Sequence, residues 1–155
     1  MPMNLKIGDS APNFELPNQN GEIVKLSNFQ GQKVLIYFYP RDFTPGCTTE
    51  ACSLRDSFPN FRNLNAVVLG ISKDTVGSHK KFAQKFNLPF TLLADVDHKV
   101  QEKYDVWQEK KFLGKTYMGT VRTSFLIDEK GKIAKIYEKV KPPVHAAEVL
   151  KDLKI

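Results

Sequence analysis

Residues 33–72 read KVLIYFYPRDFTPGCTTEACSLRDSFPNFRNLNAVVLGIS and predict a strand, a helix and a second strand. Lys33–Tyr39 and Ala66–Ser72 are almost continuous apolar and aromatic runs, as is typical of central strands covered on both faces. Pro40 ends the first strand because it has no N–H to donate to a neighbouring strand. A strand–helix–strand unit of this length predicts two parallel strands joined by a right-handed crossover.

The helix of this unit is expected to begin at Thr44 and Pro45. Threonine is a favoured N-cap residue, and proline is well tolerated at the first helical position. Leu54, Phe58 and Phe61 are spaced by four and three residues, which places them on one buried side of the helix. The helix therefore packs against the sheet and leaves its first turn at the end of the first strand.

The rest of the chain predicts further elements without a repeat, a linker or a break in composition. They are a hairpin over 14–26, a helix over 78–86, a strand over 91–94, a helix over 97–104, a hairpin over 123–137 and a helix over 144–153. The expected fold class is α/β, with a mixed central sheet flanked by helices and an N-terminal β-hairpin. Residues 1–155 are expected to form a single domain, since 155 residues bury an adequate core without disulfides or metals.

Composition excludes several classes of protein. The longest apolar run, Val34–Tyr39, is far shorter than the about 20 residues of a membrane span. The net charge is +6, but the lysines are scattered, so neither a nucleic-acid partner nor a membrane partner is expected. Two cysteines, with no apolar signal segment in the first six residues, favour the reducing cytoplasm.

Cys47 is the residue most suited to chemistry. With Thr44 as N-cap, Cys47 takes the third helical position, among N–H groups that have no partner within the helix. These groups and the positive end of the helix dipole favour the thiolate, which is the nucleophilic form. The alternative is a buried, inert cysteine that behaves as a small apolar residue.

Cys52 lies five residues after Cys47. In an unbroken helix this spacing separates the two Cα atoms by roughly 8.7 Å, whereas a disulfide needs less than about 7 Å. Either the two thiols never meet, or the first turns unwind after Cys47 has reacted. The four intervening residues also disfavour exchange of the Cys-x-x-Cys type. A core-facing cysteine without a redox role is the alternative for Cys52.

Other chemistries find less support. The cysteines and His79, His98 and His145 show no compact spacing for a zinc site, and no local signature of a cysteine protease is present. Arg122 stands where a loop enters a predicted strand. Near Cys47 it would stabilise a thiolate, and the alternative is an ordinary surface arginine.

The pattern Pro40-x-x-x-Thr44-x-x-Cys47 resembles the active-site motif of the peroxiredoxins. Within them, TPGCTTEAC at 44–52 resembles the bacterioferritin comigratory protein, or PrxQ, group, and the similarity extends over essentially the whole chain. The resemblance implies a thioredoxin-like fold and thiol-dependent reduction of hydrogen peroxide and organic hydroperoxides. It implies no metal, haem or flavin cofactor.

The resemblance also assigns roles. Cys47 would be the peroxidatic cysteine, which becomes a sulfenic acid, and Thr44 would orient the peroxide. Arg122 would stabilise the thiolate and the breaking oxygen–oxygen bond, while Glu50 would hold Arg122 by a charge-assisted hydrogen bond. Pro40 would shield the pocket.

Cys52 matches the resolving cysteine of this group and would form an intramolecular disulfide with Cys47. Thioredoxin or a similar dithiol would reduce that disulfide, and a monomer is expected because no second subunit is needed. Three alternatives remain open at this point: a general thiol–disulfide oxidoreductase, a redox sensor without turnover, and a nucleic-acid-binding module.

Overall fold

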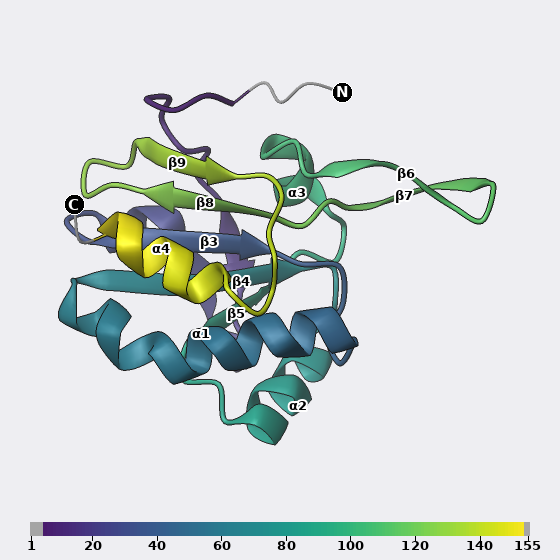
Figure 1. Cartoon of the computed structure of the whole chain (residues 1–155), viewed down its shortest axis with the longest axis horizontal. Coiled ribbons are helices and arrows are strands. Elements are labelled where there is room, and N and C mark those ends of the chain that lie inside the picture. Colours follow the sequence, from purple (N-terminus) through teal and green to yellow (C-terminus); the bar gives the residue numbers. More distant parts are fainter. Residues whose placement is uncertain (1–4, 154–155) are drawn as a thin grey trace.

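The computed structural model describes residues 5–153 and contains a central five-stranded sheet of strand order β5-β4-β3-β8-β9 (Figure 1). Its strands are β3 (Lys33–Phe38), β4 (Ala66–Ser72), β5 (Thr91–Ala94), β8 (Thr123–Ile127) and β9 (Ile133–Tyr137). β3, β4 and β5 are parallel, and β8 and β9 run antiparallel to their neighbours. The predicted mixed sheet and its parallel first pair are confirmed.

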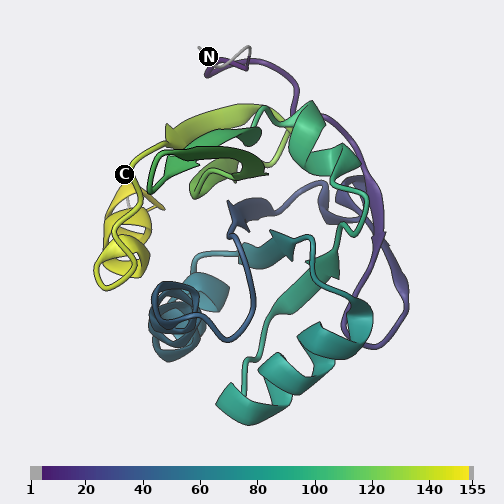
Figure 2. The same ribbon diagram turned by 90° about the vertical axis from the view of Figure 1, so that its right-hand side faces the viewer.

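Alternate residues of β3 face two separate layers of the core. Leu35 and Tyr37 pack with α1 (Pro45–Asn63), α2 (Val76–Phe86) and α4 (His145–Leu153). Ile36 and Phe38 instead pack toward β1 (Glu15–Pro17) and α3 (Lys99–Lys103), on the other face (Figure 2). Because both faces of β3 are covered, its sequence is apolar throughout rather than alternating.

The remaining described elements lie at the periphery. β2 (Ile23–Lys25) pairs with β1 in the predicted N-terminal hairpin, and a 3-10 turn, η1 (Leu26–Phe29), leads into β3. Thr75 caps α2 through its side chain, so that helix begins two residues earlier than predicted. Within residues 5–153, no helix combines the length and hydropathy that crossing a membrane requires. A single domain over 1–155 stays a prediction, because 1–4 and 154–155 lie outside the described residues.

One hairpin was not predicted. β6 (Trp107–Phe112) and β7 (Lys115–Thr120) pair antiparallel around a two-residue turn in which Leu113 and Gly114 both have positive φ. The hairpin projects well beyond the body of the molecule (Figure 1). Its residues are mostly exposed on both faces, so they lack the alternation of apolar and polar residues by which half-buried strands are found. The sequence signal available for this turn was Gly114, because glycine readily adopts the positive φ that such a turn requires.

Candidate active site

Cys47 occupies the third position of α1, directly after the loop that follows the carboxyl end of β3. Its side chain is almost fully enclosed, with 1% of the residue exposed. The backbone N–H of Thr48 donates to the carbonyl of Thr44, which is the first hydrogen bond of the helix. The thiol therefore lies in the first turn of α1, as predicted, beside free N–H groups and the positive end of the helix dipole.

Arg122 binds Cys47 directly. Its Nη2 donates to Cys47 Sγ at 3.1 Å, and its Nη1 donates to Glu50 Oε1 at 2.6 Å. Gly46 allows this approach, since a Cβ at that position would lie 3.3 Å from Nη2. The guanidinium thus connects the sulfur to a carboxylate one helical turn further along α1.

Sheet topology explains how a residue so distant in sequence reaches Cys47. Arg122 lies in the short connection between β7 and β8, and Thr123 at the start of β8 pairs with Phe38 at the end of β3. The beginning of β8 and the loop after β3 therefore meet at one edge of the sheet. The alternative of an ordinary surface arginine is excluded by these contacts.

Glu50 is fully buried, and burial raises its pKa from the ordinary 4.5 to about 7, against the opposing effect of the Arg122 guanidinium. Its Oε2 has no hydrogen-bond partner among the described residues, which adds to the cost of ionising this carboxyl group. Burial alone would lower the pKa of Arg122, but Glu50 and Cys47 outweigh it and raise the pKa. The cation at the sulfur is therefore permanent.

Thr44 and Pro40 lie on the loop between β3 and α1. Thr44 is the N-cap residue by position, but its side chain makes no capping hydrogen bond, contrary to what the choice of threonine predicts. Its hydroxyl donates instead to the carbonyl of Arg41 at 2.8 Å, so its oxygen keeps its acceptor capacity. Pro40 is half-buried at the end of β3.

Cys47 and Cys52 are both free thiols on the same continuous helix. Cys52 is half-buried, whereas Cys47 is enclosed. Five residues of helix turn by about 140°, which directs the two side chains to different sides of α1. A bond between them therefore requires the first turns of α1 to unwind.

A buried polar network anchors the loop that carries Thr44, and sequence reasoning missed it. Asp42 Oδ2 lies 2.8 Å from His79 Nδ1, and Asp42 also accepts from the hydroxyl groups of Tyr39 and Ser78. His79 Nε2 faces the carbonyl of Leu93 at 3.0 Å. Both ring nitrogens of His79 therefore have hydrogen-bond partners, and the contact between His79 and Asp42 is fully buried.

Asp42, Asp74 and His79 form a group whose potential ligand atoms all lie within 4.8 Å of one another. Asp74 accepts from the backbone N–H of Asp42 and from the hydroxyl of Ser72, so these groups satisfy one another as hydrogen-bond partners. We interpret the group as a structural anchor. The sequence did not reveal this group because Asp42 lies in the loop after β3, whereas Asp74 lies in the loop after β4 and His79 on α2.

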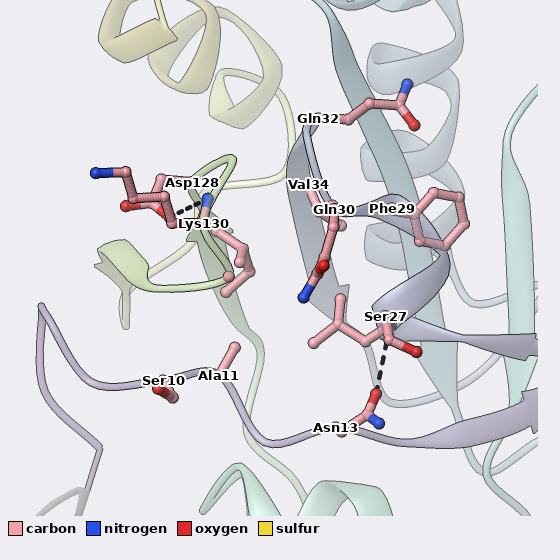
Figure 3. A pocket seen from close by; sticks show the side chains of 13 residues that line it. Ser10, Ala11, Asn13, Ser27, Phe29, Gln30, Gln32, Val34, Asp128 and Lys130 are labelled. Carbon is pink, nitrogen blue, oxygen red and sulfur yellow. Dashed lines mark hydrogen bonds between the residues drawn. The ribbon is translucent and has the colours of Figure 1, made fainter.

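The pocket of Figure 3 lies at the opposite end of the sheet from Cys47. It is lined by Val34 at the start of β3 and by Ile127 at the end of β8, whereas Cys47 follows the far end of β3. Neither cysteine lines it, and two of its polar side chains serve local backbone groups: Asp128 accepts from the backbone N–H of Lys130, and Asn13 accepts from that of Ser27. This pocket belongs to the fold rather than to the thiol site.

A single helix-initiating cysteine that accepts from an arginine is suited to attacking a small oxygen-bearing substrate. A dithiol exchanger instead keeps its two thiols close enough to bond. The site is therefore that of a thiol peroxidase on a thioredoxin-like sheet.

Known proteins agree with this assignment. The AhpC/TSA family profile matches residues 7–136. Peroxiredoxin Bcp of Bacillus subtilis (strain 168) is 51% identical over 152 residues, which cover 98% of this chain and 97% of that protein. The chain therefore belongs to the AhpC/TSA family, among its Bcp peroxiredoxins, and it is a thiol-dependent peroxidase.

Solved structures show the same likeness. A cysteine-to-serine variant of PrxQ from Xylella fastidiosa superposes with a TM-score of 0.92 at 36% identity, covering 97% of this chain and 96% of that chain. The bacterioferritin comigratory protein of Xanthomonas campestris, studied for its alkyl peroxide reduction activity, superposes with a TM-score of 0.89 at 35% identity, covering 99% and 98%. The predicted thioredoxin-like fold is confirmed.

Proposed function

We propose that Cys47 is the peroxidatic cysteine and that Arg122 is its catalytic partner. The thiolate attacks the terminal oxygen of a hydroperoxide, the oxygen–oxygen bond breaks, and the remaining oxygen leaves as an alcohol or water after taking up a proton. The single observation that carries this proposal is the Arg122 guanidinium, which bridges Cys47 Sγ and Glu50 Oε1. It stabilises the thiolate and the charge that develops on the leaving oxygen.

Thr44 and Pro40 complete this proposal for the site. Thr44 orients the peroxide through its hydroxyl, which has free acceptor capacity beside the first turn of α1. Pro40, which lies at the end of β3, shields the Cys47 thiol from solvent. Glu50 acts as a positioning residue, because it contacts Arg122 rather than the substrate.

Cys52 resolves the sulfenic acid in this proposal. Its thiolate attacks the Cys47 sulfur, the sulfenic oxygen leaves as water, and an intramolecular disulfide forms. The enclosed position of Cys47 and the continuity of α1 make unwinding of the first turns a necessary step. Thioredoxin or a similar dithiol then returns both cysteines to thiols.

The proposed substrates are hydrogen peroxide and organic hydroperoxides. The alkyl peroxide reduction activity described for the Xanthomonas campestris relative supports the second class. The cycle joins cysteines of one chain, so a monomer suffices, and a reducing cytoplasm suits two free thiols.

The first experiment is thiol titration with intact-mass analysis after one equivalent of hydrogen peroxide. We expect wild type to lose both thiols and two hydrogens. Cys47→Ser should lose peroxidase activity, and Cys52→Ser should complete one oxidation but not recycle efficiently with thioredoxin. Normal steady-state turnover by Cys52→Ser would remove Cys52 from the mechanism. Oxidation without turnover by wild type would favour a redox sensor.

A further inference from the structure

The tip of the β6–β7 hairpin presents large apolar side chains to solvent. We define the tip as residues 110–118. Phe112 is 66% exposed and Leu113 is 86% exposed, and Tyr117 and Met118 are 48% and 51% exposed. The tip projects away from the rest of the molecule (Figure 1). Adjacent exposed apolar residues at the end of a projection indicate a contact surface.

These side chains are distributed around the tip rather than on one side of it. Phe112 pairs with Lys115, and Tyr117 pairs with Lys110, so Phe112 and Tyr117 share one face of the ribbon. Met118 pairs with Glu109 and lies on the opposite face, and Leu113 occupies the turn. A flat protein surface would cover one of these faces, whereas a fluid medium that surrounds the tip covers all of them.

Positive charge flanks the apolar side chains. Lys111 and Lys115 lie beside the turn, whereas the ammonium group of Lys110 donates to the carbonyl of Thr120 at the base of the hairpin. Glu109 is the one acidic residue between 107 and 120. Lysine stems can lie along apolar surface while their ammonium groups reach an anionic boundary. A second copy of this chain would bring the same lysines and the same net charge of +6, which opposes self-association through the tip.

The hairpin and the thiol site are found at the same end of the molecule. Figures 1 and 2 show β6 and β7 projecting on the side at which α1 begins. Arg122 follows the end of β7 by two residues. A surface that receives the tip is therefore approached by the end of the molecule that carries Cys47.

We propose that the hairpin tip binds the surface of an anionic lipid bilayer. Leu113 and Phe112 insert at the boundary between headgroups and acyl chains, and the lysines contact lipid phosphates. Leu113 lies two residues, or about 7 Å along the ribbon, beyond the Lys111–Thr116 pair, which is within the depth of about 5–10 Å that interfacial segments reach. The bilayer is contacted and not crossed, but this proposal departs from the sequence-based expectation of no membrane partner.

One consequence rests on the proposed function. If Cys47 reduces organic hydroperoxides, a protein bound through the tip would hold the Cys47 end of the molecule close to hydroperoxides of the lipid. Binding itself is independent of the thiol chemistry, so Cys47→Ser should bind vesicles as tightly as wild type.

The test is sedimentation of the reduced protein with peroxide-free vesicles. One set contains phosphatidylcholine alone, and the other contains equal parts phosphatidylcholine and phosphatidylglycerol. We expect binding to the anionic vesicles that weakens with added salt, and little binding to the neutral ones. Leu113→Asp should lower the partition coefficient about tenfold or more, because the leucine no longer enters the lipid.

Matched variants separate the tip from general effects of charge. Ile23→Asp places the same charge at another exposed apolar residue, on β2. Its partition coefficient should be close to that of wild type, because Ile23 lies outside the tip. Lys111→Glu with Lys115→Glu should weaken binding by at least about fivefold for each lysine. Lys80→Glu with Lys81→Glu, on the exposed side of α2, changes the net charge equally and should weaken binding much less.

Three results would overturn the proposal. The first is no binding to anionic vesicles at low salt, and the second is equal weakening by Leu113→Asp and Ile23→Asp. The third is a tip-dependent complex with a second copy or with an acidic protein such as thioredoxin, in the absence of vesicle binding. Circular dichroism and the rate of Cys47 oxidation by hydrogen peroxide should be unchanged in Leu113→Asp, which excludes misfolding as the cause.

Discussion

Arg122 and Glu50 illustrate how single residues set the properties of the site. Glu50 is buried with one oxygen on Arg122 and the other without a partner among the described residues. Its raised pKa of about 7 means that the charge which holds Arg122 is maintained at a cost in folding free energy. The site is therefore a place where function and stability oppose each other.

Glu50→Gln should change the pH dependence of stability. The folded-state pKa of about 7 exceeds the ordinary 4.5, so the folded state binds more protons between these values. The free energy of unfolding should therefore fall as pH rises from about 4.5 to about 7, by up to about 3 kcal/mol from Glu50 alone. Urea unfolding across this range should show a larger fall in wild type and in the exposed control Glu109→Gln than in Glu50→Gln, where only other groups, such as the buried Asp95 with its raised pKa, contribute. Equal slopes in all three proteins would contradict the prediction.

Asp42→Asn should destabilise the protein strongly. It replaces the buried carboxyl group that contacts His79 Nδ1 and accepts from the hydroxyl groups of Tyr39 and Ser78. Breaking a buried pair in this way costs about 3 kcal/mol or more. Chemical denaturation should measure this loss, whereas Asp56→Asn, an exposed carboxyl group on α1, should change stability by less than about 0.5 kcal/mol. A loss as small as that of the control would mean that the network does not hold the loop.

The first turns of α1 perform two opposed tasks among the secondary-structure elements. As a helix they place Cys47 among free N–H groups. In the proposed mechanism they must unwind so that Cys52 can reach Cys47. The stability of this segment therefore sets the rate of disulfide formation under the proposed mechanism. It also sets how long the sulfenic acid is exposed to further oxidation.

Thr49→Ala should slow the formation of the disulfide. Thr49 is exposed between the two cysteines, and alanine stabilises a helix by about 0.6 kcal/mol relative to threonine. We expect the Cys47–Cys52 bond to form about threefold more slowly, with more sulfinic acid at high peroxide, while the first oxidation is unchanged. Quenched-flow mass spectrometry follows both steps. Asn60→Ala raises helix propensity beyond Cys52, and a similar slowing in that variant would exclude local unwinding as the cause.

Under the proposed mechanism, the oxidised form of the whole molecule is partly unfolded, because the first turns of α1 must unwind. Unwinding the first turns of α1 to form the disulfide would separate Glu50 from Arg122 and expose Ala51. Glu50 and Ala51 are both fully buried in the reduced protein. A disulfide that closes so short a loop constrains the unfolded chain weakly. The cross-link therefore does not compensate for the lost contacts.

The oxidised protein should consequently be less stable than the reduced protein. We expect its free energy of unfolding to be lower by about 2 kcal/mol in guanidinium chloride. Cys52→Ser, treated with peroxide in the same way, serves as the control without a disulfide. Greater stability of the oxidised form would indicate that the disulfide forms without unwinding of α1.

The sequence was sufficient to predict the central sheet, the helices that flank it and the position of Cys47 in the first turn of α1. The apolar run of β3, Pro40 after it and Thr44-Pro45 at the start of α1 are local signals, because each acts on the backbone within a few residues. The same locality placed Cys47 in a first turn and showed that Cys52 cannot bond across an intact helix. The β6–β7 hairpin was missed because it buries neither face, and the capping hydrogen bond of Thr44 is replaced by one to Arg41.

From its position in the sequence, Arg122 could lie either beside Cys47 or on the surface. The sequence also gave no reason to expect contact between Asp42 and His79. Antiparallel pairing of β8 with β3 brings Arg122 to Cys47 Sγ, and packing of α2 against the sheet brings His79 to Asp42. Such contacts depend on long-range pairing and packing, whereas strand and helix signals depend on neighbouring residues. Local signals in the chain therefore determined the position of Cys47, whereas pairing and packing of distant segments placed Arg122 beside it and His79 beside Asp42.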